Sequence, residues 1–328
     1  MTPATTTPRS HDATTGAGAA STAPARAPTL RELVDAYMAA YAGRDRSRVA
    51  QLARLCELLG DRPFVSLTDD DVFRALEQLA SEPARVYYGR DAGGARILRA
   101  KPGLRSPATV NRYHAALSAV FTWAVKKRIA PRGFENPCRK VERGPEDPGV
   151  LRFLSSEECD RLLEACRESS WSRLYVLVLM ALTTGARRGE LLGLTWGDVE
   201  LERAAAHVRD SKNGHPRTLP LLPGVLEELR RFAIARPEAC VFPSRGALTR
   251  PRAFESSWTA ALKRARIRNF RFHDLRHTCA SYLAQNGASL LEIADVLGHR
   301  QMQMTRRYAH LTTDSKAKLI NRVLGGIR

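Results

Sequence analysis

The sequence lacks long uninterrupted apolar runs. Nowhere do about 18 apolar residues follow one another, which is the length that a membrane-spanning helix requires. Residues 1–28 are rich in Thr, Ala and Pro and contain no apolar core of a secretory signal. We therefore expect no membrane association, a cytoplasmic location, and a disordered arm over residues 1–28.

Paired cysteines and clustered acidic residues are also missing. None of the six cysteines forms a C-x-x-C pair, so neither a disulfide framework nor a zinc site is indicated. Asp69, Asp70 and Asp71 follow Thr68, which is typical of the acidic first turn of a helix rather than of a metal site. No spaced Asp/Glu cluster lies near the basic regions, so a metal-dependent nuclease or transposase has no support. We expect neither a metal nor a cofactor.

Positive charge is abundant. Lys and Arg number 52 against 34 Asp and Glu, a formal net charge of +18. Such an excess favours a polyanionic partner, although a solubilising surface is the alternative. Basic residues cluster between 126 and 143 and again between Arg252 and Arg276, where only Glu255 and Asp274 oppose seven of them. The residues that we expect to contact DNA are Lys126, Lys127, Arg128, Arg264, Arg268 and Arg271.

Helical spacing dominates residues 29–142. Leu30, Leu33, Val34 and Tyr37 recur on one helix face, with Thr29 as the expected cap. Further helices are predicted at 48–59, 69–79 and 107–126. The stretch 82–106, rich in Gly, Pro and Arg, indicates a long loop or a β-hairpin. These patterns predict an all-α first domain.

A linker is predicted over residues 143–153, because two prolines and two glycines fall between Arg143 and Gly149. The second domain, 154–328, opens with the capping-box pattern of Ser155 and Glu158. Two strands, 204–209 and 217–221, flank Asn213-Gly214, a strong hairpin signal. The predicted helices are 171–183, 187–194, 222–235, 253–265, 274–285, 290–297 and 315–323. The whole chain is therefore expected to be mainly α with a small β-sheet.

Cleavage of a phosphodiester without a metal needs a nucleophile, cations for the non-bridging oxygens and a proton donor for the leaving oxygen. The second domain contains such a set. In chain order the stretches are Thr184-Gly-Ala-Arg187-Arg-Gly-Glu190, Lys212 beside the Asn-Gly turn, His273-Asp-Leu-Arg276-His277, Leu297-Gly-His299 and Arg306-Arg-Tyr308-Ala-His310.

With these motifs in this order, the sequence resembles the tyrosine recombinase (phage integrase) family over nearly all of Thr29–Arg328. The resemblance implies a helical, SAM-like core-binding domain at 29–142 and a mostly helical catalytic domain at 154–328. Together the two domains would close as a clamp around DNA.

The resemblance also implies the roles of individual residues. Tyr308 would form a 3′-phosphotyrosyl link, and Arg187 and Arg276 would hold the non-bridging oxygens. His273 and His299 would donate hydrogen bonds, and His273 is a candidate acceptor of the tyrosine proton. Lys212 would protonate the leaving 5′-oxygen, and Glu190 matches a supporting position.

The partners that the resemblance implies are double-stranded DNA with specific recombination sites and three further copies of the chain. Four protomers would join two duplexes through a Holliday junction, without ATP. Accessory DNA-bending or directionality proteins are expected for some members, and the protein would be associated with the nucleoid.

Each of these residues, taken alone, also has an ordinary structural interpretation. Tyr308 could be a packing tyrosine, His299 a cap contact and Lys212 an ordinary turn residue. We take four further histidines as structural or DNA-facing; they are His207, His215, His277 and His310. Two other functions stay open, a type IB topoisomerase-like relaxing enzyme and a DNA-binding clamp without catalysis. The L-G-H and R-Y-A-H stretches favour a recombinase over the first, and the complete chemical set argues against the second.

Overall fold

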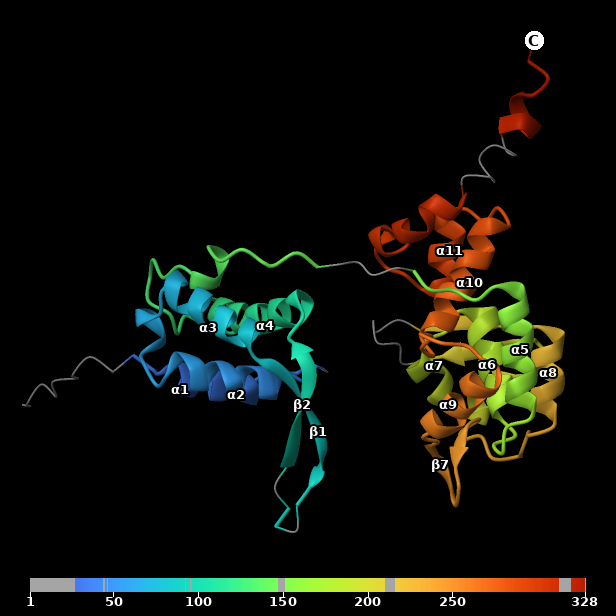
Figure 1. The fold of residues 1–328 in the computed structure, drawn as a ribbon, viewed down its shortest axis with the longest axis horizontal. Helices are drawn as coiled ribbons and strands as arrows, with labels where there is room; N and C mark the ends of the chain where they lie inside the picture. Colours follow the sequence, from blue (N-terminus) through green and yellow to red (C-terminus); the bar gives the residue numbers. More distant parts are fainter. Residues whose placement is uncertain are drawn as a thin grey trace, which may run out of the picture. The chain divides into compact units, whose positions relative to one another are not determined.

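The chain divides into two compact units, Met1–Pro148 and Gly149–Arg328 (Figure 1). The computed structural model describes residues 27–327 except 44, 46, 92, 95, 147–150, 210–215 and 313–319. The division falls within the predicted linker at 143–153. The functional assignment of each unit remains a prediction at this stage.

The first unit is a bundle of helices. Its elements are α1 (Leu30–Ala39), α2 (Ser47–Leu59), α3 (Asp69–Ser81) and α4 (Pro107–Lys126), with 3₁₀ turns η1 (Phe64–Ser66) and η2 (Pro137–Arg139). Thr29 caps α1, and Thr68 caps α3 in a box with Asp71, so the aspartate run is the acidic first turn of a helix. The long α4 buries Leu117 and Phe121 where it packs against α1, α2 and α3. Burying side chains of this size stabilises the bundle by about 1.5–3 kcal/mol each.

A β-hairpin is inserted between α3 and α4. Strands β1 (Pro83–Arg90) and β2 (Arg96–Leu104) pair antiparallel (Figure 1). Arg105 is buried at the base of the hairpin, where its Nη1 donates to the Leu79 carbonyl (2.9 Å) and to Glu82 Oε2 (3.1 Å). Arg54 binds the other oxygen of Glu82. The predicted helices are thus confirmed in the bundle. Residues 82–106 form a β-hairpin, which was one of the two alternatives predicted for this stretch.

The second unit is mostly helical with two small antiparallel sheets. Its helices are α5 (Ser156–Arg167), α6 (Leu174–Thr184), α7 (Arg188–Leu192), α8 (Pro223–Arg230), α9 (Glu255–Arg264), α10 (Asp274–Gln285) and α11 (Leu290–Leu297). Its strands are β3 (Val199–Glu200), β4 (Ala205–Val208) and β5 (Arg217–Pro220) in one sheet, and β6 (Pro243–Ser244) and β7 (Ala247–Pro251) in the other. Three 3₁₀ segments complete it: η3 (Trp196–Asp198), η4 (Met302–Met304) and η5 (Arg306–Thr312).

The apolar helix α6 lies in the core of this unit, where it packs against α5, α8 and α10. It ends at Gly185, whose φ of +58° is left-handed. A Cβ at this position would stand 2.5 Å from Leu297 Cδ2, so the close approach of α11 also requires glycine. The chain can therefore turn sharply here and place Arg187 directly beyond the end of α6.

Several boundaries differ from the sequence prediction. Helices α10 and α11 have the predicted bounds, whereas α7 is only five residues long because Arg187 is its N-cap. Helix α8 ends at Arg230, five residues earlier than predicted, and the β6–β7 hairpin was not predicted. Of the predicted helix 315–323, residues 315–319 lie outside the described part of the chain, and 320–324 are helical.

Candidate active site

Two motifs that are far apart in the sequence meet at the end of α6. Arg276, in the first turn of α10, donates from Nη1 to the carbonyl oxygen of Gly185 at 2.7 Å. This bond ties the Thr184–Glu190 stretch to the His273–His277 stretch. Arg187 is near enough that its charge lowers the pKa of Arg276. The two predicted phosphate-binding arginines therefore share one site.

Arg276 carries an unsatisfied donor. The residue is 4% exposed, and its Nη2 is buried without a hydrogen-bond partner among the described residues. Burial, followed by the charges of Arg187 and Arg217, lowers the pKa of Arg276 to about 10, so it stays charged at neutral pH. A buried N–H without an acceptor costs about 1–3 kcal/mol, and an anion that enters the site would recover this cost.

Glu190 organises the arginines. It accepts hydrogen bonds from the backbone N–H (2.9 Å) and Nη1 (2.8 Å) of Arg187, and from Nη2 of Arg217 (2.8 Å). Burial raises the pKa of Glu190, but the hydrogen bonds from Arg217 and Arg187 outweigh it, and the net shift is downward. We call Arg187, Arg217 and Arg276 the arginine cluster. The predicted supporting role of Glu190 agrees with this geometry.

Arg217 was not a predicted site residue. It starts β5, and its Nη1 donates to the carbonyl of Val296 at 2.6 Å, near the end of α11. The side chain is 14% exposed. Arg217 therefore connects β5 to Glu190 and to α11, the helix that precedes His299. In the sequence it is one more arginine near a turn, and only its fold partners distinguish it.

His299 follows Gly298, which ends α11 with a φ of +64°. Its Nδ1 forms a hydrogen bond of 2.8 Å with Oγ1 of the buried Thr305. Burial, then the charges of Arg276 and Arg187, lowers the pKa of His299 to about 4. The imidazole is thus neutral at pH 7, and the predicted role of His299 as a hydrogen-bond donor to phosphate remains a prediction.

Tyr308 lies in the 3₁₀ segment η5 and is 1% exposed. Its ring belongs to an apolar cluster with Ala280, Ala284, Ile293 and Leu297. Burial raises the pKa of Tyr308 to about 12, although Arg307 and Arg276 oppose the shift. The hydroxyl is therefore protonated at neutral pH, within electrostatic reach of the arginine cluster.

The hydroxyl of Tyr308 has an unexpected partner. His277 Nδ1 lies 2.6 Å from Tyr308 Oη, although the sequence suggested a structural or DNA-facing residue at position 277. His273, the N-cap residue of α10, packs its ring against His277 at 5.2 Å between centroids. Burial and then Arg276 lower the pKa of His273. Within the described residues, no hydrogen bond joins His273 to Tyr308.

Lys212 lies outside the described residues, as does the Asn213-Gly214 turn. The flanking strands are described, and Val208 of β4 pairs with Arg217 of β5. Of the two paired residues, Arg217 belongs to the arginine cluster. The role of Lys212 as a proton donor remains a prediction.

The predicted DNA-contacting residues differ in their surroundings. Lys126, Lys127 and Arg128 are exposed at the end of α4, and Arg268 is exposed in the second unit. Arg264 instead pairs with Glu168 (3.1 Å) and donates to the Ala165 carbonyl. Its charge is therefore partly neutralised within the second unit. Arg271, 83% exposed, pairs with Asp274.

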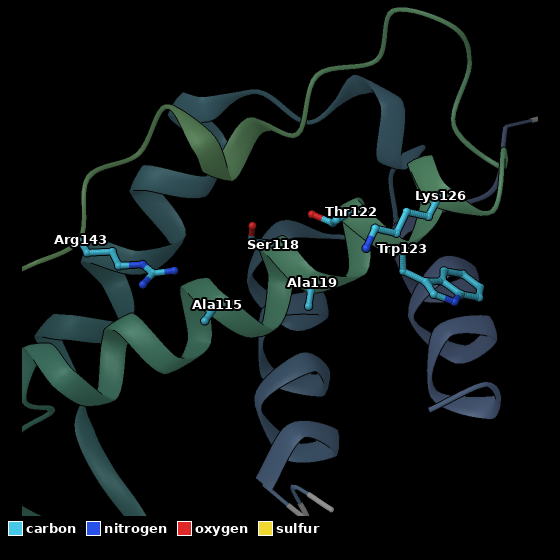
Figure 2. A pocket seen from close by; sticks show the side chains of 7 residues that line it. All are labelled: Ala115, Ser118, Ala119, Thr122, Trp123, Lys126 and Arg143. Carbon is cyan, nitrogen blue, oxygen red and sulfur yellow. The ribbon is translucent and has the colours of Figure 1, made fainter. Parts of the chain in front are cut away.

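A pocket on α4 supports a nucleic-acid surface on the first unit. Ala115, Ser118, Ala119, Thr122 and Trp123 line it together with Lys126 and Arg143. Figure 2 shows the two basic side chains at opposite ends of this row, in which the residues other than Trp123 are small. Small side chains let a duplex approach closely, and the flanking cations suit phosphates.

The described residues contain no group of three or more His, Cys, Asp or Glu side chains that could hold a metal ion. No helix among them is long and apolar enough to cross a bilayer.

The comparison with family models gives a match to the phage integrase family over residues 152–315. The integrase of Haemophilus phage HP1 is 33% identical over 269 residues, which cover 81% of this chain and 70% of that protein. Three further curated relatives, two integrases and a DNA recombinase, are matched over 48–61% of their own length, so the chain spans only about half of these proteins.

Solved structures share the fold. The Tn1549 transposon integrase, in complex with a circular intermediate DNA, superposes with a TM-score of 0.66 at 19% identity, over 90% of this chain and 100% of that one. Lambda integrase, as a tetramer bound to a Holliday junction, gives a TM-score of 0.60 at 20% identity, over 87% of this chain and 78% of that one. At these identities the likeness shows the fold alone.

Proposed function

Because the chain belongs to the phage integrase family, we propose that it is a site-specific DNA recombinase that cleaves and rejoins DNA through Tyr308. One observation carries the proposal. Arg276 is buried with a free Nη2 donor among the described residues, in one site with Arg187 and within electrostatic reach of Tyr308. Buried donors are usually hydrogen-bonded, and an anion that enters the site would satisfy this one.

The reaction begins with a phosphodiester in the arginine cluster. Arg276 Nη2 and the guanidinium of Arg187 bind the non-bridging oxygens, on which negative charge grows as Tyr308 Oη attacks phosphorus. His299 Nε2 and His273 donate further hydrogen bonds. Donors of this kind typically contribute about a hundred- to a thousandfold in rate each.

The proton balance needs a base and an acid. Tyr308 loses its proton as the O–P bond forms, and His273 is the acceptor that the family resemblance implies. The 5′-oxygen leaves with a proton from Lys212. The bond energy stays in the 3′-phosphotyrosyl link, so resealing by a 5′-hydroxyl needs neither ATP nor a metal.

The partner proposed for this chain is double-stranded DNA with specific recombination sites. The tetramer of lambda integrase on a Holliday junction supports an assembly of four protomers on two duplexes here as well. The basic end of α4 and Arg268 would contact the backbone phosphates, and accessory DNA-bending or directionality proteins would select the direction.

The proposal is tested with nicked suicide duplexes made from DNA that flanks the gene. In EDTA, the wild-type protein should form an SDS-resistant covalent adduct, and Tyr308→Phe should bind the same duplex without forming one. Tight binding with no adduct on any fragment would favour the non-catalytic clamp. Relaxation of supercoils without strand exchange between two sites would favour the topoisomerase-like alternative.

The same assay tests Lys212. Lys212→Ala should cleave slowly, and a substrate with sulfur at the 5′-leaving position should restore the rate, because a thiolate leaves without a proton. A defect that is equal on both substrates would remove Lys212 from the role of acid.

A further inference from the structure

The short contact between His277 and Tyr308 belongs to no motif role. Oη of Tyr308 and Nδ1 of His277 are 2.6 Å apart, and no other hydrogen bond of this hydroxyl is recorded within the described residues. The two rings lie 6.1 Å apart between centroids and are tilted by 46°. The apolar side chains around Tyr308 confine its ring but provide no polar group that would direct the oxygen.

Helix α10 explains what this contact achieves. His277 directly follows Arg276, and both project from the first turn of the same helix. The segment η5 that carries Tyr308 packs on α10. The hydrogen bond between Tyr308 and His277 therefore ties the tyrosine oxygen to the helix turn that carries Arg276.

We propose that His277 is a positioning residue, which holds Tyr308 Oη in register with Arg276 through Nδ1. The inference rests on the proposed function and adds a residue to it. Misplacing a reacting group by about 1 Å can cost about a hundredfold in rate, so one well-placed hydrogen bond is a sufficient device.

The protonation state of His277 suits this role. Burial lowers its pKa to about 4, and Arg307, His273 and Arg276 act in the same direction, against Asp274. The imidazole is thus neutral at pH 7 and adds no positive charge beside the arginine cluster. A neutral imidazole can form a hydrogen bond with the Tyr308 hydroxyl. Unlike a charged imidazolium, it does not attract carboxylate or phosphate groups.

The test compares three substitutions in single-turnover cleavage of the suicide duplex. An Asn side chain places its amide near the position of imidazole Nδ1, a Gln side chain places it near Nε2, and Phe has neither. We expect His277→Phe and His277→Gln to cleave about tenfold to a hundredfold more slowly, and His277→Asn to recover most of the rate. DNA affinity should be unchanged in all three.

The matched control is Ser281→Ala, one turn further along α10. Ser281 is buried and its hydroxyl has no hydrogen-bond partner within the described part of the chain. This variant should cleave at the wild-type rate, and thermal melting of all four variants identifies any that fail to fold. Equal cleavage rates in the three His277 variants would overturn the proposal. So would a loss of cleavage rate in His277→Asn as large as that in His277→Phe. A wild-type protein that forms no adduct would instead overturn the proposed function.

A second, independent observation concerns the β1–β2 hairpin. Between residues 83 and 104 the sequence has five basic side chains and one acidic side chain. Arg85, Arg99 and Lys101 are exposed, and none of them has an ion pair within the described residues. The guanidinium of Arg99 lies 3.4 Å from the ring centroid of Tyr88, which is 60% exposed. These three cations of the ribbon thus form an exposed basic surface on the described part of the hairpin.

The base of the hairpin is fixed although its strands are exposed. Glu82 joins Arg54 of α2 to the buried Arg105, at 2.5 and 3.1 Å. These ion pairs connect the base of the ribbon to the helical bundle. The hairpin is thus a supported projection, and the major groove of DNA is wide enough for a two-stranded ribbon.

We infer that the hairpin is an additional arm that contacts duplex DNA, beyond the contacts made by α4. The charge complementarity between the ribbon and the phosphates carries this inference. It depends on the proposed function only in that the partner is DNA.

The experiment measures DNA affinity against salt concentration. The triple variant Arg85→Gln, Arg99→Gln, Lys101→Gln should lower the slope of log K against log[salt] by about 2–3, since each phosphate contact contributes about 0.9. The control triple Arg230→Gln, Arg231→Gln, Arg236→Gln removes the same charge from the region of α8 and should leave the slope unchanged.

Equal slopes in both triple variants would overturn the inference. Normal DNA binding by the hairpin variant, combined with loss of strand exchange between two duplexes, would also overturn it and would indicate a protein partner instead. Adduct formation at saturating protein and low salt should persist in both variants, which separates this result from a failure of the proposed function.

Discussion

The two units use positive charge in different ways. In the second unit, Arg187 and Arg217 are largely buried and share the Glu190 carboxylate. Burial and the charges of these two arginines lower the pKa of Arg276. In the first unit, the cations at the end of α4 and those described on the hairpin are exposed; they are Lys126, Lys127, Arg128, Arg85, Arg99 and Lys101. Net charge alone does not distinguish the buried cations of the second unit from the exposed cations of the first. On the proposed function, burial beside Glu190 marks the cations that would hold the reacting phosphate, and exposure marks those that would attract the duplex.

The largest effect is expected for a buried cation. Arg276→Lys keeps the charge but loses the second N–H group and the planar fork. Single-turnover cleavage should fall by about a hundred- to a thousandfold, while equilibrium binding of the duplex changes little. A loss in rate below tenfold would mean that Arg276 does not bind the transition state.

Removal of the shared counterion should mainly affect stability. Glu190→Gln leaves Arg217 and Arg187 without their carboxylate at a position where Glu190 is 3% exposed. The free energy of unfolding at pH 7 should drop by about 3 kcal/mol or more, as measured by urea denaturation. Because the folded pKa of Glu190 is below 4.5, its contribution is present above pH 4.5 and is lost as the pH falls through the folded value. The difference between wild type and variant should therefore narrow on acidification, and a constant difference would contradict the account.

The buried histidines predict a second pH effect. Their folded pKa values of about 4, for both His277 and His299, lie below the ordinary 6.5. Between pH 6.5 and 4 the unfolded chain binds protons that the folded chain does not, so stability falls as the pH decreases. The melting temperature should drop from pH 7 to pH 5, and it should drop less in His277→Asn and in His299→Asn. An identical pH dependence in wild type and variants would show that other groups cause the effect.

The smallest effect is expected for a single exposed cation. Lys126→Ala should weaken DNA binding by less than about tenfold and lower the salt slope by about 1. Cleavage at saturating protein should remain at the wild-type rate. If Lys126→Ala slows cleavage at saturation as much as Arg276→Lys does, the distinction between the two kinds of cation fails.

Much of the second unit could be predicted because its signals are local. Helices α10 and α11 have the predicted bounds, and Gly298 caps the end of α11. The structure brings Arg187 and Arg276 into one site, with His299 and Tyr308 within electrostatic reach. Motifs that combine a turn glycine with a chemical residue can be identified from the sequence alone.

Other parts depend on tertiary contacts that no local pattern encodes. Arg217 becomes important only through Glu190 and the carbonyl of Val296, which are 27 and 79 residues away. The role of His277 depends on η5, which packs on α10 from 31 residues further along the chain. The β6–β7 hairpin was not predicted because its strands are short, lack β-branched apolar residues, and have Pro243 and Pro251 at their ends.

The central claim is that Tyr308 becomes covalently bound to DNA in the arginine cluster. Mass spectrometry of the proteolysed adduct, formed on a suicide duplex in EDTA, tests this claim directly. The account predicts one nucleotide-linked peptide, with the phosphodiester on Tyr308. A nucleotide on any other residue, or an adduct that persists in Tyr308→Phe, would contradict it.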